Sequence, residues 1–159
     1  MSDQTNHSTR VRHPIQWASL AVALAFLLVG VLGFIPGVTQ DLDEIEWIGH
    51  ESGAELLGIF EVSVLHNLLH LALGLIGLVL ARTVRGAQYF LVGGGVVYLI
   101  LWIYGLAVDQ TSDANFVPLN DADNWLHLGL GVGMILLGIL LAPRDRKTRT
   151  ASTVDYRSS

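Results

Sequence analysis

Three histidines and two asparagines lie inside otherwise apolar stretches of the chain, where ionisable and polar side chains are costly and therefore indicate function. His66 and His70 are spaced i, i+4, which places both on one face of a helix. Asn67 lies between them, and Asn124 and His127 repeat its Asn-x-x-His spacing later in the chain. Imidazoles on facing helices could bind a metal ion, ligate a haem from both sides, or relay protons.

The composition excludes several classes of protein. Of 159 residues, 52% are apolar and only 14% are charged, whereas a soluble domain usually has about 25% charged residues. The chain has no cysteine, which excludes disulfides, thiolate metal sites and a cysteine nucleophile. No Ser-His-Asp arrangement, phosphate-binding loop or pair of catalytic carboxylates stands out. The sequence therefore predicts a non-catalytic protein that is not a water-soluble enzyme.

Four apolar stretches are long enough to cross a membrane, which takes roughly 20 residues. They run over about 15–35, 62–81, 89–108 and 125–142, and none has a charged residue in its interior. The predicted fold is an all-α membrane protein with one four-helix transmembrane domain over 15–142. Polar tails flank it, at 1–14 and, rich in basic residues, at 143–159.

The charged residues separate by segment. Basic residues occur only before the first stretch, between the second and third, and after the fourth. The two remaining loops hold seven and four acidic residues, eleven of the chain's 14. The positive-inside rule then predicts a multi-pass protein of the cytoplasmic membrane with both termini inside. We expect the basic tail to contact lipid headgroups rather than nucleic acid.

An internal repeat links the second and fourth stretches. Residues 67–74 (NLLHLALG) match residues 124–131 (NWLHLGLG) at an offset of 57, which predicts two parallel helical-hairpin repeats. Small residues continue the polar faces, Gly74 and Gly77 in one helix and Gly131 in the other, and should let the second and fourth helices pack through these faces. Gly129 and Gly133 lie on a different face, where they could contact a neighbouring helix or the second subunit of a homo-oligomer.

The polar residues leave three functional hypotheses open. In the first, the protein has a structural or interaction role, and each histidine forms hydrogen bonds with the nearby asparagine or the partner helix. In the second, His70 and His127 bind a metal ion or haem. In the third, the acidic outer loops and the histidines form a proton or cation path. The first requires no cofactor and no partner other than the bilayer.

The loops carry further expectations. Apolar residues interleave with the acidic ones over residues 37–61, a spacing typical of one or two short surface helices with Trp47 at the membrane interface. A solvated acidic face is favoured there over a cation site, because the spacing is not that of an EF-hand. Asp121, Asp123 and Asn124 are expected to cap the last helix.

Three segments together resemble a known family. They are residues 32–37 (LGFIPG), residues 57–70 with LGIFEV followed by LHNLLH, and residues 121–127 (DADNWLH). The chain resembles, over roughly residues 14–142, the bacterial four-helix membrane proteins of domain-of-unknown-function family 4383. The resemblance implies a small polytopic protein of the cytoplasmic membrane. It implies no particular reaction, substrate or cofactor.

Overall fold

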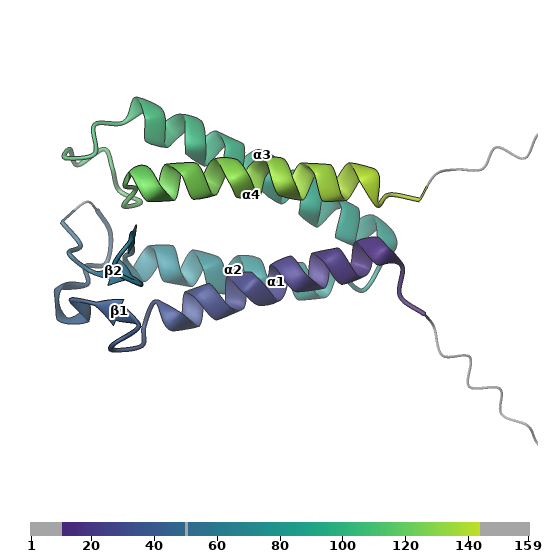
Figure 1. The fold of residues 1–159 in the computed structure, drawn as a ribbon, viewed down its shortest axis with the longest axis horizontal. Coiled ribbons are helices and arrows are strands. Elements are labelled where there is room, and N and C mark those ends of the chain that lie inside the picture. The colour runs from purple at the N-terminus through teal and green to yellow at the C-terminus, as the bar shows by residue number, and fades with distance from the viewer. Residues whose placement is uncertain (1–10, 50, 144–159) are drawn as a thin grey trace, which may run out of the picture.

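The computed structural model describes residues 11–49 and 51–143, and these contain four α-helices and a small sheet. The helices are α1 (Pro14–Leu32), α2 (Val64–Leu80), α3 (Val84–Ala107) and α4 (Asp121–Leu140). Figure 1 shows two helical hairpins side by side, α1 with α2 and α3 with α4. The strands and the long loops gather at one end of the bundle, and α1 begins and α4 ends at the other.

Side chains at the helix starts fix where each helix begins. His13 and Gln16 form a capping box at α1, and Asn120 and Asp123 form another at α4. Ser63 and Thr83 accept a backbone N–H at the starts of α2 and α3. Each cap satisfies donors that the first helical turn leaves unpaired.

These caps explain why the helices differ from the predicted stretches. The third helix begins at Val84 rather than near residue 89, because Thr83 caps it and α2 has already ended at Leu80. The first helix ends at Leu32, since Gly33 is its C-cap and the chain then turns. The fourth begins at Asp121, with Asn120 as its N-cap, so Asp121 and Asp123 lie in its first turn, where acidic side chains suit the helix dipole.

The expectation of surface helices in the first loop is wrong. The loop forms a three-stranded antiparallel sheet of β1 (Thr39–Gln40), β2 (Glu55–Leu56) and β3 (Phe60–Glu61), with one 3-10 turn, η1 (Leu42–Glu44). Ala54, Leu56 and Val62 are buried there in a small cluster with partly buried side chains of the loop and of α1, whereas Trp47, Ile48 and Ile59 are more than half exposed. The fold is therefore mostly helical, with one small sheet in this loop.

Glycines bring the two helices of each hairpin together. A Cβ atom on Gly74 would lie 2.6 Å from Leu27 Cγ of α1, and one on Gly131 would lie 2.8 Å from Leu99 Cγ of α3. Gly77 lies against Ala23 of α1, but it also lies against Phe90 of α3, across the two hairpins. The glycine faces of α2 and α4 are thus buried, but they do not pack against each other: Gly74 and Gly131 each meet the other helix of their own hairpin.

Gly129 and Gly133 have no such neighbour. Among the described residues, no atom other than their own helix backbone and chain neighbours lies within 4 Å of a Cβ placed on either. A packing partner for this face would have to come from outside the described chain, so the idea of a second subunit stays a prediction.

Candidate functional site

Three buried imidazoles meet near the end of the bundle that carries the sheet. The ring centroids of His66 and His70 are 4.7 Å apart, and those of His66 and His127 are 6.4 Å apart. Their exposed fractions are 6%, 8% and 3%. His66 brings the histidines of the two hairpins together, a role that the repeat pattern did not indicate because His66 has no histidine at the matching position of α4.

Two aromatic rings line the inner side of this cluster. The ring of Phe26 stacks on that of Tyr98 with centroids 5.4 Å apart and planes 17° apart. Phe26 lies 5.8 Å from His70, and Tyr98 lies 5.2 Å from His127. Each hairpin therefore contributes one aromatic ring beside its own histidine, and the two rings meet between the hairpins.

The asparagines do not pair with the Nδ1 atoms of these histidines. Asn67 Nδ2 donates to the carbonyl oxygen of Gly33 at the end of α1 (2.9 Å), and Asn124 Nδ2 donates to that of Gly105 on α3 (3.1 Å). A Cβ on either glycine would overlap the asparagine side chain, so both positions need glycine. The asparagines thus hold each hairpin together at the same level as the histidines.

The three Nδ1 atoms of the histidine cluster are buried without a hydrogen-bond partner in the described structure. Buried polar side-chain atoms are paired in the large majority of cases, and each exception calls for an explanation. Since an unpaired buried polar group is costly, these atoms call for an explanation, as do Ser19 Oγ and the Oδ1 atoms of Asn67, Asn115 and Asn124, which are also buried without a described partner.

Asp123 adds a carboxylate at the sheet end of the site. Its Oδ2 atom accepts hydrogen bonds from the backbone N–H of Glu61 (3.1 Å) and of Asn120 (3.2 Å), and its side chain is 2% exposed. The expected capping role is therefore only part of what it does. It also ties β3 to the start of α4, which are far apart in the sequence.

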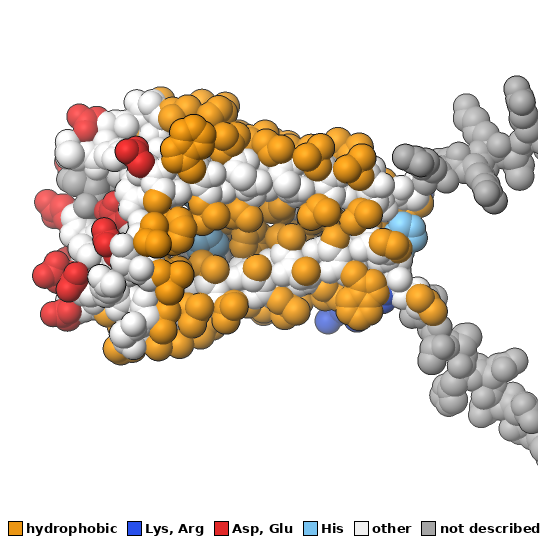
Figure 2. All heavy atoms as spheres, viewed as in Figure 1, with side chains coloured by type: hydrophobic (Ala, Val, Ile, Leu, Met, Phe, Trp, Pro, Cys, Tyr) orange, Lys and Arg blue, Asp and Glu red, His pale blue; other side chains and the backbone are white. Residues whose placement is uncertain are grey.

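A cavity of about 270 Å³ adjoins the histidine cluster. Its polar residues are His66, His70, His127 and Asp123, and the rest of its lining is apolar: Ala25, Phe26, Val29, Leu32, Leu56, Leu57, Phe60, Val62, Leu126 and Leu130. Figure 2 shows histidine atoms at the floor of a hollow between α1 and α4. The cavity thus opens through the side of the bundle.

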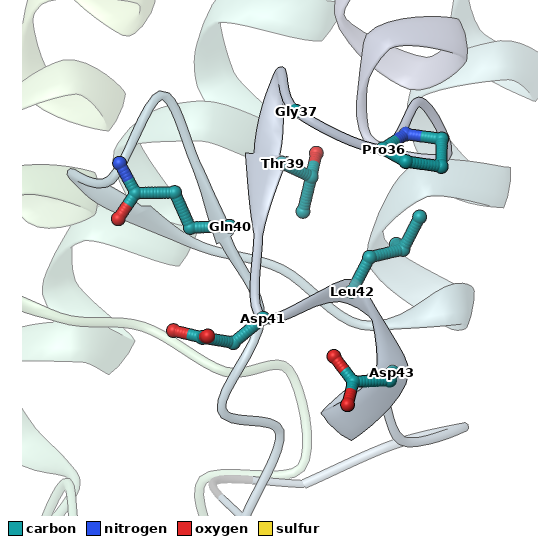
Figure 3. Close-up of a pocket in the computed structure, with 7 residues that line it drawn as sticks. All are labelled: Pro36, Gly37, Thr39, Gln40, Asp41, Leu42 and Asp43. Atoms are coloured by element: carbon teal, nitrogen blue, oxygen red, sulfur yellow. The ribbon is translucent and has the colours of Figure 1, made fainter.

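The residues present do not form a ready metal centre. Within residues 11–49 and 51–143, no group of three or more His, Cys, Asp or Glu side chains is arranged to hold a metal ion. A second hollow lies on the loop between α1 and α2, lined by residues 36, 37 and 39–43. Figure 3 shows that its two carboxylates do not converge, because Asp41 points away from Asp43.

Comparison with known proteins assigns the chain to a family. The family profile described as "Domain of unknown function (DUF4383)" matches residues 16–140, most of the described structure. The chain belongs to the DUF4383 family. No curated protein and no solved structure matches it. The family named from the three sequence segments is confirmed.

The DUF4383 domain includes the whole histidine cluster and its cavity, since all of their residues lie between 16 and 140. Sequence reasoning missed three parts of it: Phe26, Tyr98 and the reach of Asp123 to the sheet. One available signal was a shared pair of residues: an aromatic residue followed by leucine occurs as Phe26-Leu27 in the first hairpin and as Tyr98-Leu99 in the second. The helical period alone could not show that their rings touch.

Proposed function

We propose that this DUF4383 protein is a non-catalytic, four-helix protein of the cytoplasmic membrane that binds a small lipid-soluble molecule in the histidine-lined cavity. One observation carries the binding role: three buried histidines, each with an Nδ1 atom that has no described partner, line a cavity that opens between α1 and α4. The other residues with an unpaired buried side-chain atom, Ser19, Asn67, Asn115 and Asn124, do not line it.

The surface supports a place in the membrane. Three helices, α1, α3 and α4, are long and apolar enough to cross a bilayer, and no more than a third of each apolar window is buried. Large apolar side chains cover the outer faces of the helices, as Figure 2 shows in orange. Soluble monomers rarely expose contiguous apolar areas larger than a few hundred Å², so lipid is the environment that fits this surface.

The shorter helix, α2, would cross as well. Its 17 residues span about 26 Å, slightly less than a hydrocarbon core of about 30 Å. It runs from the end of the bundle where α1 finishes to the end where α3 begins. Gln16 Nε2 also donates to the carbonyl oxygen of Ala81 (2.9 Å), which fixes the start of α1 beside the end of α2. If α1 and α3 cross the membrane, α2 must cross between them.

The charges support an orientation with both termini in the cytoplasm. Acidic side chains gather at the sheet end of the molecule in Figure 2. The described arginines, Arg12, Arg82 and Arg85, lie before α1, in the turn after α2 and in the first turn of α3, at the opposite end. The positive-inside rule then places the sheet and the histidine cluster toward the outer surface.

The proposed hairpin repeat also finds support in the contacts. Gly74 meets Leu27 and Gly131 meets Leu99, while Asn67 binds Gly33 and Asn124 binds Gly105. The α1 residues in these contacts each lie 72 positions before their counterparts in α3: Leu27 before Leu99 and Gly33 before Gly105. The stacked rings of Phe26 and Tyr98 have the same offset. We therefore infer that α1 and α3 are repeat partners too.

The other two hypotheses are less well supported. A metal centre lacks a suitable ligand group among the described residues. A proton path from the acidic end would meet the stacked rings of Phe26 and Tyr98 directly beneath the histidines, with Phe90 at 6.3 Å from Phe26. Three aromatic rings at this level would interrupt the chain of water molecules that a proton path requires.

Closing the mouth of the cavity tests the binding role. Ala25 is an exposed residue of α1 that lines the mouth, so Ala25→Trp should fill the opening without disturbing the core. Ala21→Trp is the matched control, because Ala21 is exposed one turn earlier and does not line the cavity. We expect a lipid-soluble compound to copurify with the wild type and with Ala21→Trp, and to be absent from Ala25→Trp, in organic extracts analysed by mass spectrometry. The same compounds in all three extracts would contradict the binding role.

A further inference from the structure

The cavity opens through a part of the surface that the proposed bilayer would cover. Its lining includes apolar residues of α1 and α4, among them Ala25, Val29, Leu126 and Leu130, and Ala25 is exposed. Leu126 is 41% exposed, on a face of α4 that the proposed bilayer would cover. A molecule that reaches the imidazoles by this route must be soluble in hydrocarbon, and a long apolar tail could remain between the two helices.

The polar floor selects the head of the ligand. Among the described residues, no lysine or arginine lines the cavity, so an anionic head such as a carboxylate or phosphate would find no cationic partner there. The imidazoles of the lining can donate or accept a hydrogen bond according to tautomer. The floor therefore suits a neutral head with oxygen atoms that accept or donate hydrogen bonds.

The size and walls of the cavity indicate a single flat ring. A dry cavity of about 150 Å³ is enough to hold benzene, so about 270 Å³ accommodates one substituted six-membered ring. The aromatic ring of Phe26 forms part of the wall, next to His70. A planar head could stack on this ring while its oxygens face the imidazoles.

We infer that the cavity binds a quinone of the membrane pool: one ring with oxygen atoms on opposite edges and an apolar tail that leaves between α1 and α4. This inference rests on the proposed binding function. It concerns binding alone, in which an imidazole nitrogen of His66, His70 or His127 exchanges a hydrogen bond with a ring oxygen.

Titration with a benzoquinone that carries a ten-carbon tail tests the ligand class. We expect saturable binding by calorimetry to the wild type in detergent, and unchanged binding to Ala21→Trp. Ala25→Trp should lose it. His127→Phe keeps an aromatic ring but loses the nitrogen atoms, so we expect binding about three- to tenfold weaker, the value of one hydrogen bond. A melting curve for each variant shows that it is folded.

A second probe, with the same tail on a plain benzene ring, separates the quinone inference from the more general proposal that the cavity binds a lipid-soluble molecule. Equal affinity for both probes, with both blocked by Ala25→Trp, would overturn the quinone inference and leave the binding role standing. Binding of neither probe, while a different compound copurifies and is lost in Ala25→Trp, would also overturn only the quinone inference. If Ala25→Trp changes neither the extract nor the binding of either probe, both proposals fail.

Discussion

Gly95→Leu should destabilise the protein by about 3 kcal/mol, at the upper end of the usual cost of overpacking. A Cβ on Gly95 would lie 2.7 Å from the carbonyl oxygen of Gly131 and 2.7 Å from Cγ1 of Ile135, with the Ile135 backbone nitrogen at 3.1 Å. Because two of these atoms belong to the backbone of α4, the helices must move apart to admit a side chain. Thermal unfolding in detergent, followed by circular dichroism, measures the loss.

Gly93→Leu is the control for this prediction. Gly93 lies in the same helix two residues earlier, and among the described residues no atom other than its own helix backbone and chain neighbours lies within 4 Å of a Cβ placed on it. Both variants gain the same helix propensity, so their difference isolates the contact between α3 and α4. Equal melting temperatures for the two variants would show that this contact is not as close as described.

Asp123→Ala should cost about 2–4 kcal/mol, because it leaves two backbone N–H groups without their acceptor and each such loss costs about 1–3 kcal/mol. The groups are the N–H of Glu61 in β3 and of Asn120 at the start of α4. The change also removes half of the capping box. We expect a lower melting temperature and faster proteolysis of the outer loop.

Asp121→Ala provides the comparison. Asp121 is in the same helical turn, but it is exposed and its carboxylate accepts only from the exposed Nε2 of Gln110 (3.1 Å) among the contacts described. We expect its melting temperature to stay within the range of ordinary surface changes, about 0.5 kcal/mol. An equal effect of the two alanine variants would refute the bridge between the sheet and α4.

The helices and their buried faces could be predicted because apolar length and helical period are local properties of the sequence. His70, Gly74 and Gly77 follow one face of α2, and the structure buries that face. The helix ends were predicted less well, since single capping residues such as Thr83 decide them. The sheet of the first loop escaped prediction because its two-residue strands are too short to show an alternating pattern.

The candidate site could be predicted only in its parts. The period places His66 on the buried face of α2, but it does not say which helix that face meets. That choice depends on the hairpins, whose glycines and asparagines pair α1 with α2 and α3 with α4. The meeting of His66 with His127 across the hairpins follows from this packing, and no local pattern contains it.

Every step of the account depends on four crossings of the membrane with both termini inside, and accessibility labelling tests this most directly. The chain has no cysteine, so single cysteines can be placed at the exposed Asp43 and Asp113 of the outer loops and at Ser152, which lies outside the described residues. With a membrane-impermeant maleimide on intact cells, Asp43→Cys and Asp113→Cys should react, and Ser152→Cys should react only after the cells are opened. Labelling of Ser152→Cys in intact cells, or protection of either outer position, would contradict the account.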